Sequence, residues 1–175
     1  MKKTKLNIKD SIRDIPNFPK KGIIFKDITK LLSDPFLFAD VVNKLEKAFK
    51  KYKVNKIVVI ESRGFIFGAP LAYKLKAGIV PVRKKGKLPY KTIAASYSLE
   101  YGKATLEMHI DALEPGDRVV IIDDLLATGG TVSATIELVE KLKAKIIGIG
   151  VLIELTFLKG REKLKGNKVI SLIKY

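Results

Sequence analysis

The stretch 119–131, VVIIDDLLATGGT, places two adjacent carboxylates directly before a glycine-rich loop. Apolar residues typical of a buried strand lead into Asp123 and Asp124, and the loop precedes an expected helix. Carboxylates accept hydrogen bonds and cannot donate them, so the aspartates suit sugar hydroxyls and would repel a phosphate. Successive main-chain N–H groups in such a loop form a nest for an anion. The pattern therefore favours a ribose 5-phosphate.

The expected anion nest comprises five consecutive residues: Ala127, Thr128, Gly129, Gly130 and Thr131. No Lys-Ser/Thr follows the glycine pair, so this is not a Walker A loop, and the G-x-G-x-x-G dinucleotide fingerprint is absent. We expect the Thr131 hydroxyl to cap the following helix as well as contact the anion. The alternative is that one aspartate caps a turn that the glycines make tight.

Strands and helices alternate along the chain, and in such an arrangement a loop of this kind connects the end of a strand to the start of a helix. Apolar runs of strand length occur at 57–61, 78–82, 118–122, 145–155 and 169–173. Helical spacing is found within 35–49, 64–76 and 131–142. This order predicts an α/β fold with a mostly parallel sheet flanked by helices, built as a single domain over 1–175. Ligands bind beyond the carboxyl ends of such strands, which indicates the loops after Glu61, Val82 and Asp124.

Three other segments have recognisable local patterns. The run 95–109 alternates like a two-stranded excursion that turns near Gly102. The segment up to Arg13 resembles a short helix, and 15–22 is expected to be irregular because it holds two prolines and a glycine. Ser33, Asp34 and Pro35 are typical of a helix start.

Composition restricts the chemistry further. The 175 residues include no cysteine, which excludes disulfides, thiolate zinc sites and a cysteine nucleophile. His109 is the single histidine, so no metal site made by the protein is expected. Lys and Arg number 34 against 18 acids, for a net charge of +16, which fits either a polyanionic partner or a lysine-rich solvated surface. Without a long apolar run we expect a cytoplasmic protein with no membrane association.

The chain resembles the type I phosphoribosyltransferases, and within them the adenine-specific branch. The resemblance covers nearly the whole length and rests on six blocks in order: FPKKGIIFKDIT, ESRGFIFG, VRKKGKLP, ASYSLEYGKATLE, DALEPGDRVVIIDDLLATGGT and IELTFLKGREKL. The fifth block contains the phosphoribosyl-pyrophosphate motif that the wider superfamily shares. ASYSLEYGKA together with LKGREKL indicates the adenine-specific branch.

This resemblance implies the type I phosphoribosyltransferase fold, with a small hood and a flexible lid. It implies transfer of the 5-phosphoribosyl group from 5-phosphoribosyl 1-pyrophosphate to N9 of adenine, which yields AMP and pyrophosphate. Mg²⁺ would be carried by oxygens of the donor, with few protein ligands. A homodimer is implied, whereas a nucleic-acid partner is not.

The resemblance also implies residue roles. Asp123 and Asp124 would hold the ribose hydroxyls, and 127–131 the 5-phosphate. Pyrophosphate would be bound by Arg63, which follows the first strand, and by Arg83, Lys84 and Lys87. The family often has a non-proline cis peptide in the loop that contains Arg63. From the residues alone, Arg63 could equally form a surface ion pair and the lysines could be only solvated.

Glu100 would accept the N9 proton of adenine or stabilise the cationic sugar. For adenine, Phe25 would stack on one face, Leu155 would cover the other, and main-chain groups near Ile24 and Lys26 would contact the edge. From the residues alone, Glu100 could be an exposed hairpin acid, and the two apolar side chains could be ordinary core.

Two other functions stay open at this point. One is a phosphoribosyltransferase for another nucleobase. The other is a nucleic-acid-binding regulator of the same fold that senses 5-phosphoribosyl 1-pyrophosphate, which the net charge of +16 would suit. Such a regulator would leave Glu100 and Arg63 without a role.

Overall fold

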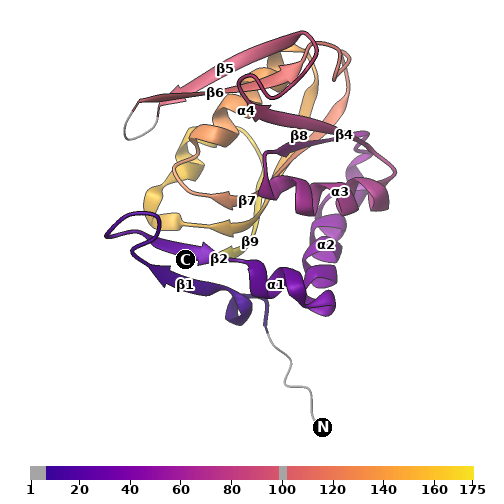
Figure 1. Ribbon diagram of the computed structural model, residues 1–175. Coiled ribbons are helices and arrows are strands. Elements are labelled where there is room, and N and C mark those ends of the chain that lie inside the picture. The colour runs from indigo at the N-terminus through magenta and orange to yellow at the C-terminus, as the bar shows by residue number, and fades with distance from the viewer. Residues whose placement is uncertain (1–6, 99–101) are drawn as a thin grey trace. The chain divides into compact units, whose positions relative to one another are not determined.

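The computed structural model of this chain describes residues 7–98 and 102–175. The chain forms two compact units, 1–44 and 45–175. Figure 1 shows the order of the elements along the chain. The smaller unit begins with a 3₁₀ turn, Lys9–Ser11, and continues with the elements β1 (Arg13–Pro16), β2 (Ile24–Asp27), α1 (Thr29–Ser33) and the start of α2 (Pro35–Phe49).

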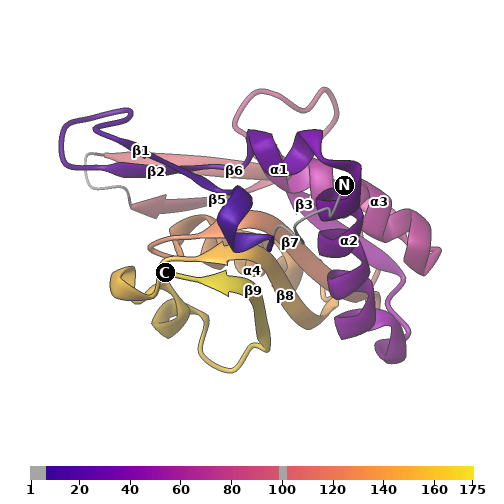
Figure 2. The same ribbon diagram turned by 90° about the horizontal axis from the view of Figure 1, so that it is seen from below.

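Strands β1 and β2 pair antiparallel in this N-terminal unit, as Figure 2 shows. The expected irregular segment is therefore partly wrong, because Ile15 and Pro16 belong to β1 and pair with β2. The short helix expected up to Arg13 is reduced to the single 3₁₀ turn in the described residues. The helix start is as expected: Asp34 Oδ1 accepts the main-chain N–H groups of Phe36 (2.9 Å) and Leu37 (3.1 Å).

A seven-stranded sheet dominates the larger unit. Its strands are β3 (Lys56–Ile60), β4 (Gly78–Lys84), β5 (Thr92–Ser98), β6 (Lys103–His109), β7 (Arg118–Leu126), β8 (Lys145–Glu154) and β9 (Val169–Lys174). The order across the sheet is β5-β6-β4-β3-β7-β8-β9. Strands β4, β3, β7, β8 and β9 are parallel, whereas β5 and β6 form an antiparallel hairpin at one edge. The predicted α/β fold with a mostly parallel sheet is confirmed.

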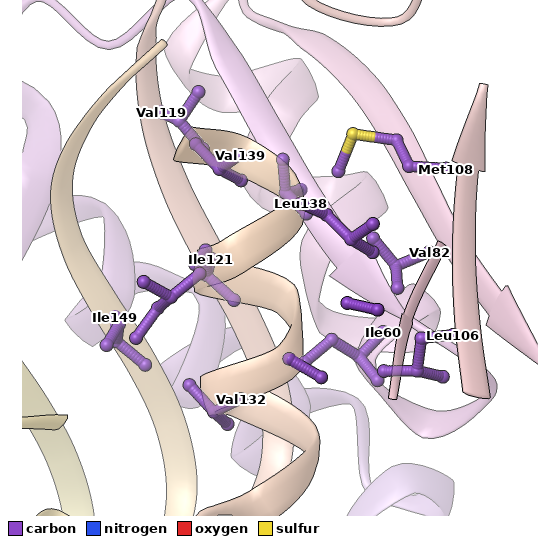
Figure 3. Close-up of a cluster of buried hydrophobic side chains, with 14 of the residues drawn as sticks. Ile60, Val82, Leu106, Met108, Val119, Ile121, Val132, Leu138, Val139 and Ile149 are labelled. Carbon is purple, nitrogen blue, oxygen red and sulfur yellow. The ribbon is translucent and has the colours of Figure 1, made fainter. Parts of the chain in front are cut away.

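Helices cover both faces of this sheet, which explains the continuous apolar runs 57–60 in β3 and 119–122 in β7. Helix α4 (Gly130–Lys141) packs on one face, where Val132, Leu138 and Val139 meet strand residues such as Ile121, as Figure 3 shows. Helix α3 (Arg63–Leu75) contacts β3 and β7. Short 3₁₀ turns complete the unit: Lys50–Tyr52, Thr156–Leu158 and Gly160–Leu164.

Strand β7 is longer than the sequence predicted. Its apolar run ends at Ile122, where pairing with β3 also stops, but β7 continues beside β8 as far as Leu126. The physical reason is the length of β8, which supplies hydrogen-bonding partners up to Glu154. Asp123 and Asp124 therefore lie within a strand, on an extension that is paired on one side only within sheet residues 45–98 and 102–175.

Candidate functional site

Side chains from three neighbouring strand ends meet at the carboxyl edge of the sheet. They surround a cavity of about 350 Å³ in the larger unit. The lining includes Arg63, Lys84, Asp123, Asp124 and Thr131 among the expected site residues. The rule that ligand sites lie beyond the carboxyl ends of parallel strands thus identifies this cavity.

The carboxylate pair is the most buried charged feature of the cavity. Asp124 is 4% exposed, and the main-chain N–H of Asp124 donates to Asp123 Oδ1 at 2.9 Å. Burial, followed by the adjacent negative charge of Asp124, raises the pKa of Asp123 well above its usual value. Burial also raises the pKa of Asp124, although Arg63 opposes that shift. Hydroxyl donors from a sugar would supply the partners that the buried Asp124 and the partly buried Asp123 need.

Arg63 begins helix α3 and points at the carboxylate pair. Its Nε lies 3.0 Å from Asp124 Oδ2, and its side chain is 34% exposed. One residue before it, the Glu61–Ser62 peptide bond is a non-proline cis bond, as the resemblance implied. A Cβ atom on Gly64 would lie 2.7 Å from the carbonyl oxygen of Ile122, closer than real Cβ atoms come. Glycine at this position therefore allows helix α3 to approach the aspartates.

Glu61 organises the cations on the β4 side of the cavity, a role that sequence reasoning missed. Its Oε1 accepts Lys87 Nζ (2.8 Å) and an Arg83 guanidinium nitrogen (3.2 Å), and its Oε2 accepts the main-chain N–H of Lys84 (3.3 Å). Burial alone would raise the pKa of Glu61, but these hydrogen bonds, from Lys87 first, lower it to about 2. The only signal in the sequence was the number of charged residues in ESRGF and VRKKGK. Which of them pair depends on the alignment of β3 with β4 in the sheet.

The expected anion nest, 127–131, connects β7 to α4. Gly129 adopts a left-handed conformation, with φ of 79°, and serves as the N-cap of α4 without a side-chain capping bond. The expectation that Thr131 caps the helix is therefore wrong, because the helix begins one residue earlier, at Gly130. A second cavity, of about 60 Å³, is lined by this loop. A Cβ on Gly130 would lie 2.8 Å from a ring carbon of Tyr97, so the β5 side chain packs against the loop.

A second cluster of charged residues lies at the end of β8. Glu154, with a side chain 6% exposed, pairs with Arg161, and Ser171 Oγ donates to its Oε2 at 2.6 Å. The hydrogen bonds from Arg161 are the main cause that lowers the pKa of Glu154, to about 2. Sequence reasoning treated LKGREKL only as a family block and missed this pair.

The residues expected to contact adenine are divided between the two units. Ile24, Phe25 and Lys26 lie on β2, where Lys26 Nζ contacts Asp14 Oδ1 at 2.6 Å and the Phe25 ring packs edge-on against Phe18. Leu155 directly follows β8 and is 9% exposed. Their joint role in a base pocket stays a prediction. Glu100 lies outside the described residues, so its role also stays a prediction.

No cluster of three or more metal-ligating side chains occurs among residues 7–98 and 102–175. Three carboxylates line the cavity, and one of them, Glu61, is paired with Arg83 and Lys87. Asp123 and Asp124 remain, which suits a divalent cation that arrives with most of its oxygen ligands already in place. Across the same described ranges, no helix has the length and apolarity needed to cross a membrane.

Comparisons with known proteins agree with this geometry. The phosphoribosyl transferase domain family matches residues 27–173. Adenine phosphoribosyltransferase from Kosmotoga olearia is 57% identical over 170 residues, which cover 97% of this chain and all of the relative. The crystal structure of adenine phosphoribosyltransferase from Thermoanaerobacter pseudethanolicus is 56% identical and covers 96% of this chain and 98% of that one, with a TM-score of 0.93.

A third relative was solved with ligands. The structure of adenine phosphoribosyltransferase from Saccharomyces cerevisiae contains adenine and D-2,5-dideoxy-2,5-imino-altritol 1,6-bisphosphate. It is 43% identical, covers 95% of this chain and 96% of that one, and has a TM-score of 0.90.

Proposed function

Because the chain belongs to the phosphoribosyltransferase family, we propose that it transfers the 5-phosphoribosyl group of 5-phosphoribosyl 1-pyrophosphate to N9 of adenine. The products are AMP and pyrophosphate, and the activity salvages a purine base. The observation that carries this proposal is the Asp123–Asp124 pair directly before an anion nest, in a cavity that cations border from α3 and β4. The full-length relatives that use adenine support the choice of base.

Two different kinds of protein group bind the sugar phosphate: carboxylates, which accept hydrogen bonds, and main-chain N–H groups, which donate them. Asp123 and Asp124 accept hydrogen bonds from the two ribose hydroxyls, and main-chain N–H groups of 127–131 donate to the 5-phosphate. The N-terminal end of α4 adds positive potential at the phosphate. Because the acids and the nest are close together in the chain, they hold the two ends of the same sugar phosphate.

Cations stabilise the departing pyrophosphate. As the bond at C1 breaks, negative charge grows on the leaving group while the sugar becomes cationic. Arg63 and Lys84 border the cavity, and Lys87 and Arg83 are held nearby by Glu61. Lys87 reaches the pyrophosphate by exchanging its carboxylate partner for phosphate oxygens.

Adenine attacks C1 through N9 and must then lose its N9 proton. Glu100, placed by resemblance in the β5–β6 connection, accepts that proton or stabilises the sugar cation. Phe25 and Leu155 enclose the base, and main-chain groups near Ile24 and Lys26 contact its edge. This role of the main chain explains why the base specificity leaves few marks in side-chain identity.

Mg²⁺ would be carried by the oxygens of the donor, and Asp123 and Asp124 are carboxylates of the cavity that would contact it. When bound, the cation neutralises part of the pyrophosphate charge. The active form is a cytoplasmic homodimer of a single phosphoribosyltransferase domain. These assignments rest on the family resemblance, and light scattering of the purified protein tests the dimer.

The function itself is tested by incubating the protein with 5-phosphoribosyl 1-pyrophosphate, Mg²⁺ and one nucleobase at a time. We expect AMP and pyrophosphate to form with adenine, and no product with hypoxanthine, guanine or uracil. Reaction with another base in place of adenine would refute the proposed substrate. Asp124→Asn serves as the matched control, because it removes a ribose contact and should abolish turnover with every base.

A further inference from the structure

The expected anion nest is pressed from one side by the main chain of Gly160. A Cβ atom on Gly160 would lie 2.1 Å from the carbonyl oxygen of Ala127 and 2.9 Å from the main-chain nitrogen of Gly129. A Cβ on Gly129 would in turn lie 2.5 Å from the carbonyl oxygen of Gly160. No side chain fits between these two backbones, so the position of one fixes the position of the other.

Arg161, the next residue, determines where Gly160 lies. Its Nε donates to Glu154 Oε1 at 2.8 Å, and a second guanidinium nitrogen donates to Glu154 Oε2. The remaining nitrogen donates to the carbonyl oxygen of Val169 at 3.1 Å. A planar guanidinium bound at both carboxylate oxygens has one orientation, so this pair fixes the segment that carries Gly160.

Glu154 connects this pair back to the start of the nest. It is the last residue of β8 and pairs in register with Leu126, which directly precedes Ala127. The main-chain N–H of Leu155 donates to the carbonyl oxygen of Leu126 at 2.9 Å. A buried carboxylate needs its full set of hydrogen-bond donors, so breaking the ion pair between Glu154 and Arg161 would be costly in free energy. These contacts connect Leu126, at the start of the nest, through the Glu154–Arg161 ion pair to Gly160, which packs against the nest.

We propose that Arg161 is a positioning residue for the 5-phosphate: through Glu154 it holds Gly160 against 127–131 and so sets the depth of the anion nest. This inference rests on the proposed function, which supplies the phosphate ligand. Main-chain N–H groups bind phosphate only within about 3 Å, so a small shift of the loop weakens the phosphate contact. Pyrophosphate is held by Arg63 and Lys84, from α3 and β4, and should not sense that shift.

The test compares two ligands on three variants of the full chain. Arg161→Lys keeps the charge but loses the two-pronged geometry, and Gly160→Ala places a methyl group against Ala127. Lys163→Ala is the control, an exposed lysine in the same 3₁₀ turn. Calorimetry measures the Kd of ribose 5-phosphate and, separately, of magnesium pyrophosphate.

We expect the Kd of ribose 5-phosphate to rise about tenfold or more in Arg161→Lys and Gly160→Ala, the loss typical of one charge-assisted contact. The Kd of magnesium pyrophosphate should stay unchanged, and the control should match the wild type for both ligands. If Gly160→Ala does not fold, Arg161→Lys decides the question alone.

Two results would overturn the inference while the proposed function stands. One is an unchanged ribose 5-phosphate Kd in Arg161→Lys, and the other is an equal loss of affinity for both ligands, which marks general damage to the fold. A wild-type protein that does not bind ribose 5-phosphate would overturn both the inference and the proposed sugar site.

Discussion

Arg63 Nε lies 3.0 Å from Asp124 Oδ2, so a cation proposed for pyrophosphate and an acid proposed for ribose are paired inside one cavity. The pair therefore connects the proposed ribose site and the proposed pyrophosphate site of 5-phosphoribosyl 1-pyrophosphate. Burial raises the pKa of Asp124, and the charge of Arg63 limits that rise. Asp124 must be ionised to accept a ribose hydroxyl at both of its oxygens.

Replacing Arg63 should therefore change the pH dependence of the reaction. In Arg63→Gln the lowering influence on the pKa of Asp124 is lost, so the acidic limb of kcat/KM for the donor should move to higher pH. Arg63→Lys keeps a positive charge and should hold the limb near its wild-type position. The measurement is kcat/KM between pH 4 and pH 9, and equal limbs in all three proteins would contradict the role given to this pair.

Gly64→Ala should damage catalysis through the aspartates. The added Cβ would meet the carbonyl oxygen of Ile122 at 2.7 Å and the Cα of Asp123 at 3.3 Å, so helix α3 or β7 must move. Misplacement by about 1 Å can cost roughly 100-fold in rate, and we expect a loss of kcat/KM of that order.

Gly78→Ala is the matched control for this change. Gly78 lies at the amino end of β4, and its added Cβ would meet the flexible Lys56 side chain first, at 3.3 Å. We expect near wild-type steady-state kinetics. Similar losses in both variants would show that a glycine-to-alanine change is harmful at either position. The loss in Gly64→Ala could then not be attributed to the close approach of helix α3 to β7.

Lys87 and Lys85 are neighbouring lysines with different expected roles. Lys87 Nζ is held 2.8 Å from Glu61 beside the cavity, so Lys87→Ala should raise the donor KM by about tenfold or more. Lys85 is exposed, and no described hydrogen bond or ion pair of its side chain connects it to Glu61, so Lys85→Ala should leave the donor KM unchanged. Initial rates at varied donor concentration distinguish them, and equal effects would indicate a nonspecific role of charge.

Glu100→Gln should lower turnover and leave the sugar site intact. Loss of a general base typically costs about 10²–10⁴ in rate, and we expect kcat to fall by that range while the Kd of ribose 5-phosphate stays constant. Glu114→Gln, in the exposed turn before β7, is the control and should keep wild-type kcat. Near-normal turnover in Glu100→Gln would exclude this glutamate from the mechanism.

Glu154 should make stability depend on pH. Its pKa in the folded protein is about 2, below the ordinary value of 4.5, so its contribution is present in full above pH 4.5 and is lost as the pH falls toward 2. The contribution is at most about 3 kcal/mol. Urea unfolding of wild type and Glu154→Gln should give a difference in free energy of unfolding that shrinks between pH 5 and pH 2.5. A difference that does not vary with pH would contradict the pairing with Arg161.

Local signals predicted the parts of the site that neighbouring residues define. The apolar run before Asp123, the glycine pair at 129–130 and the cap at Asp34 all act within a few residues, and the structure has each of them. The same reasoning stopped β7 at Ile122, because the partner that prolongs it, β8, lies more than twenty residues away.

Contacts between distant segments could not be predicted in this way. Glu61 follows β3 and contacts Lys87, which follows β4. Gly160 and Ala127 are close in space, although all of β8 lies between them in the sequence. Neither contact therefore leaves a periodic signal in the sequence. Gly160 looks like an ordinary loop glycine until its neighbour is known. The expected adenine contacts of Phe25 and Leu155 rest on family resemblance, and they stay a prediction.

The direction of the parallel strands also determines where the chain of the larger unit can be altered without affecting the cavity. Most of the cavity residues follow the ends of the parallel strands or lie late in them, whereas the turn around Gly116, before β7, carries none of the cavity residues. Gly116 has φ of 90° and nothing within 4 Å of an added Cβ, so the side of the turn to which that Cβ would point is open. That turn is therefore the place to insert an affinity tag or to open a circularly permuted chain without touching the chemistry.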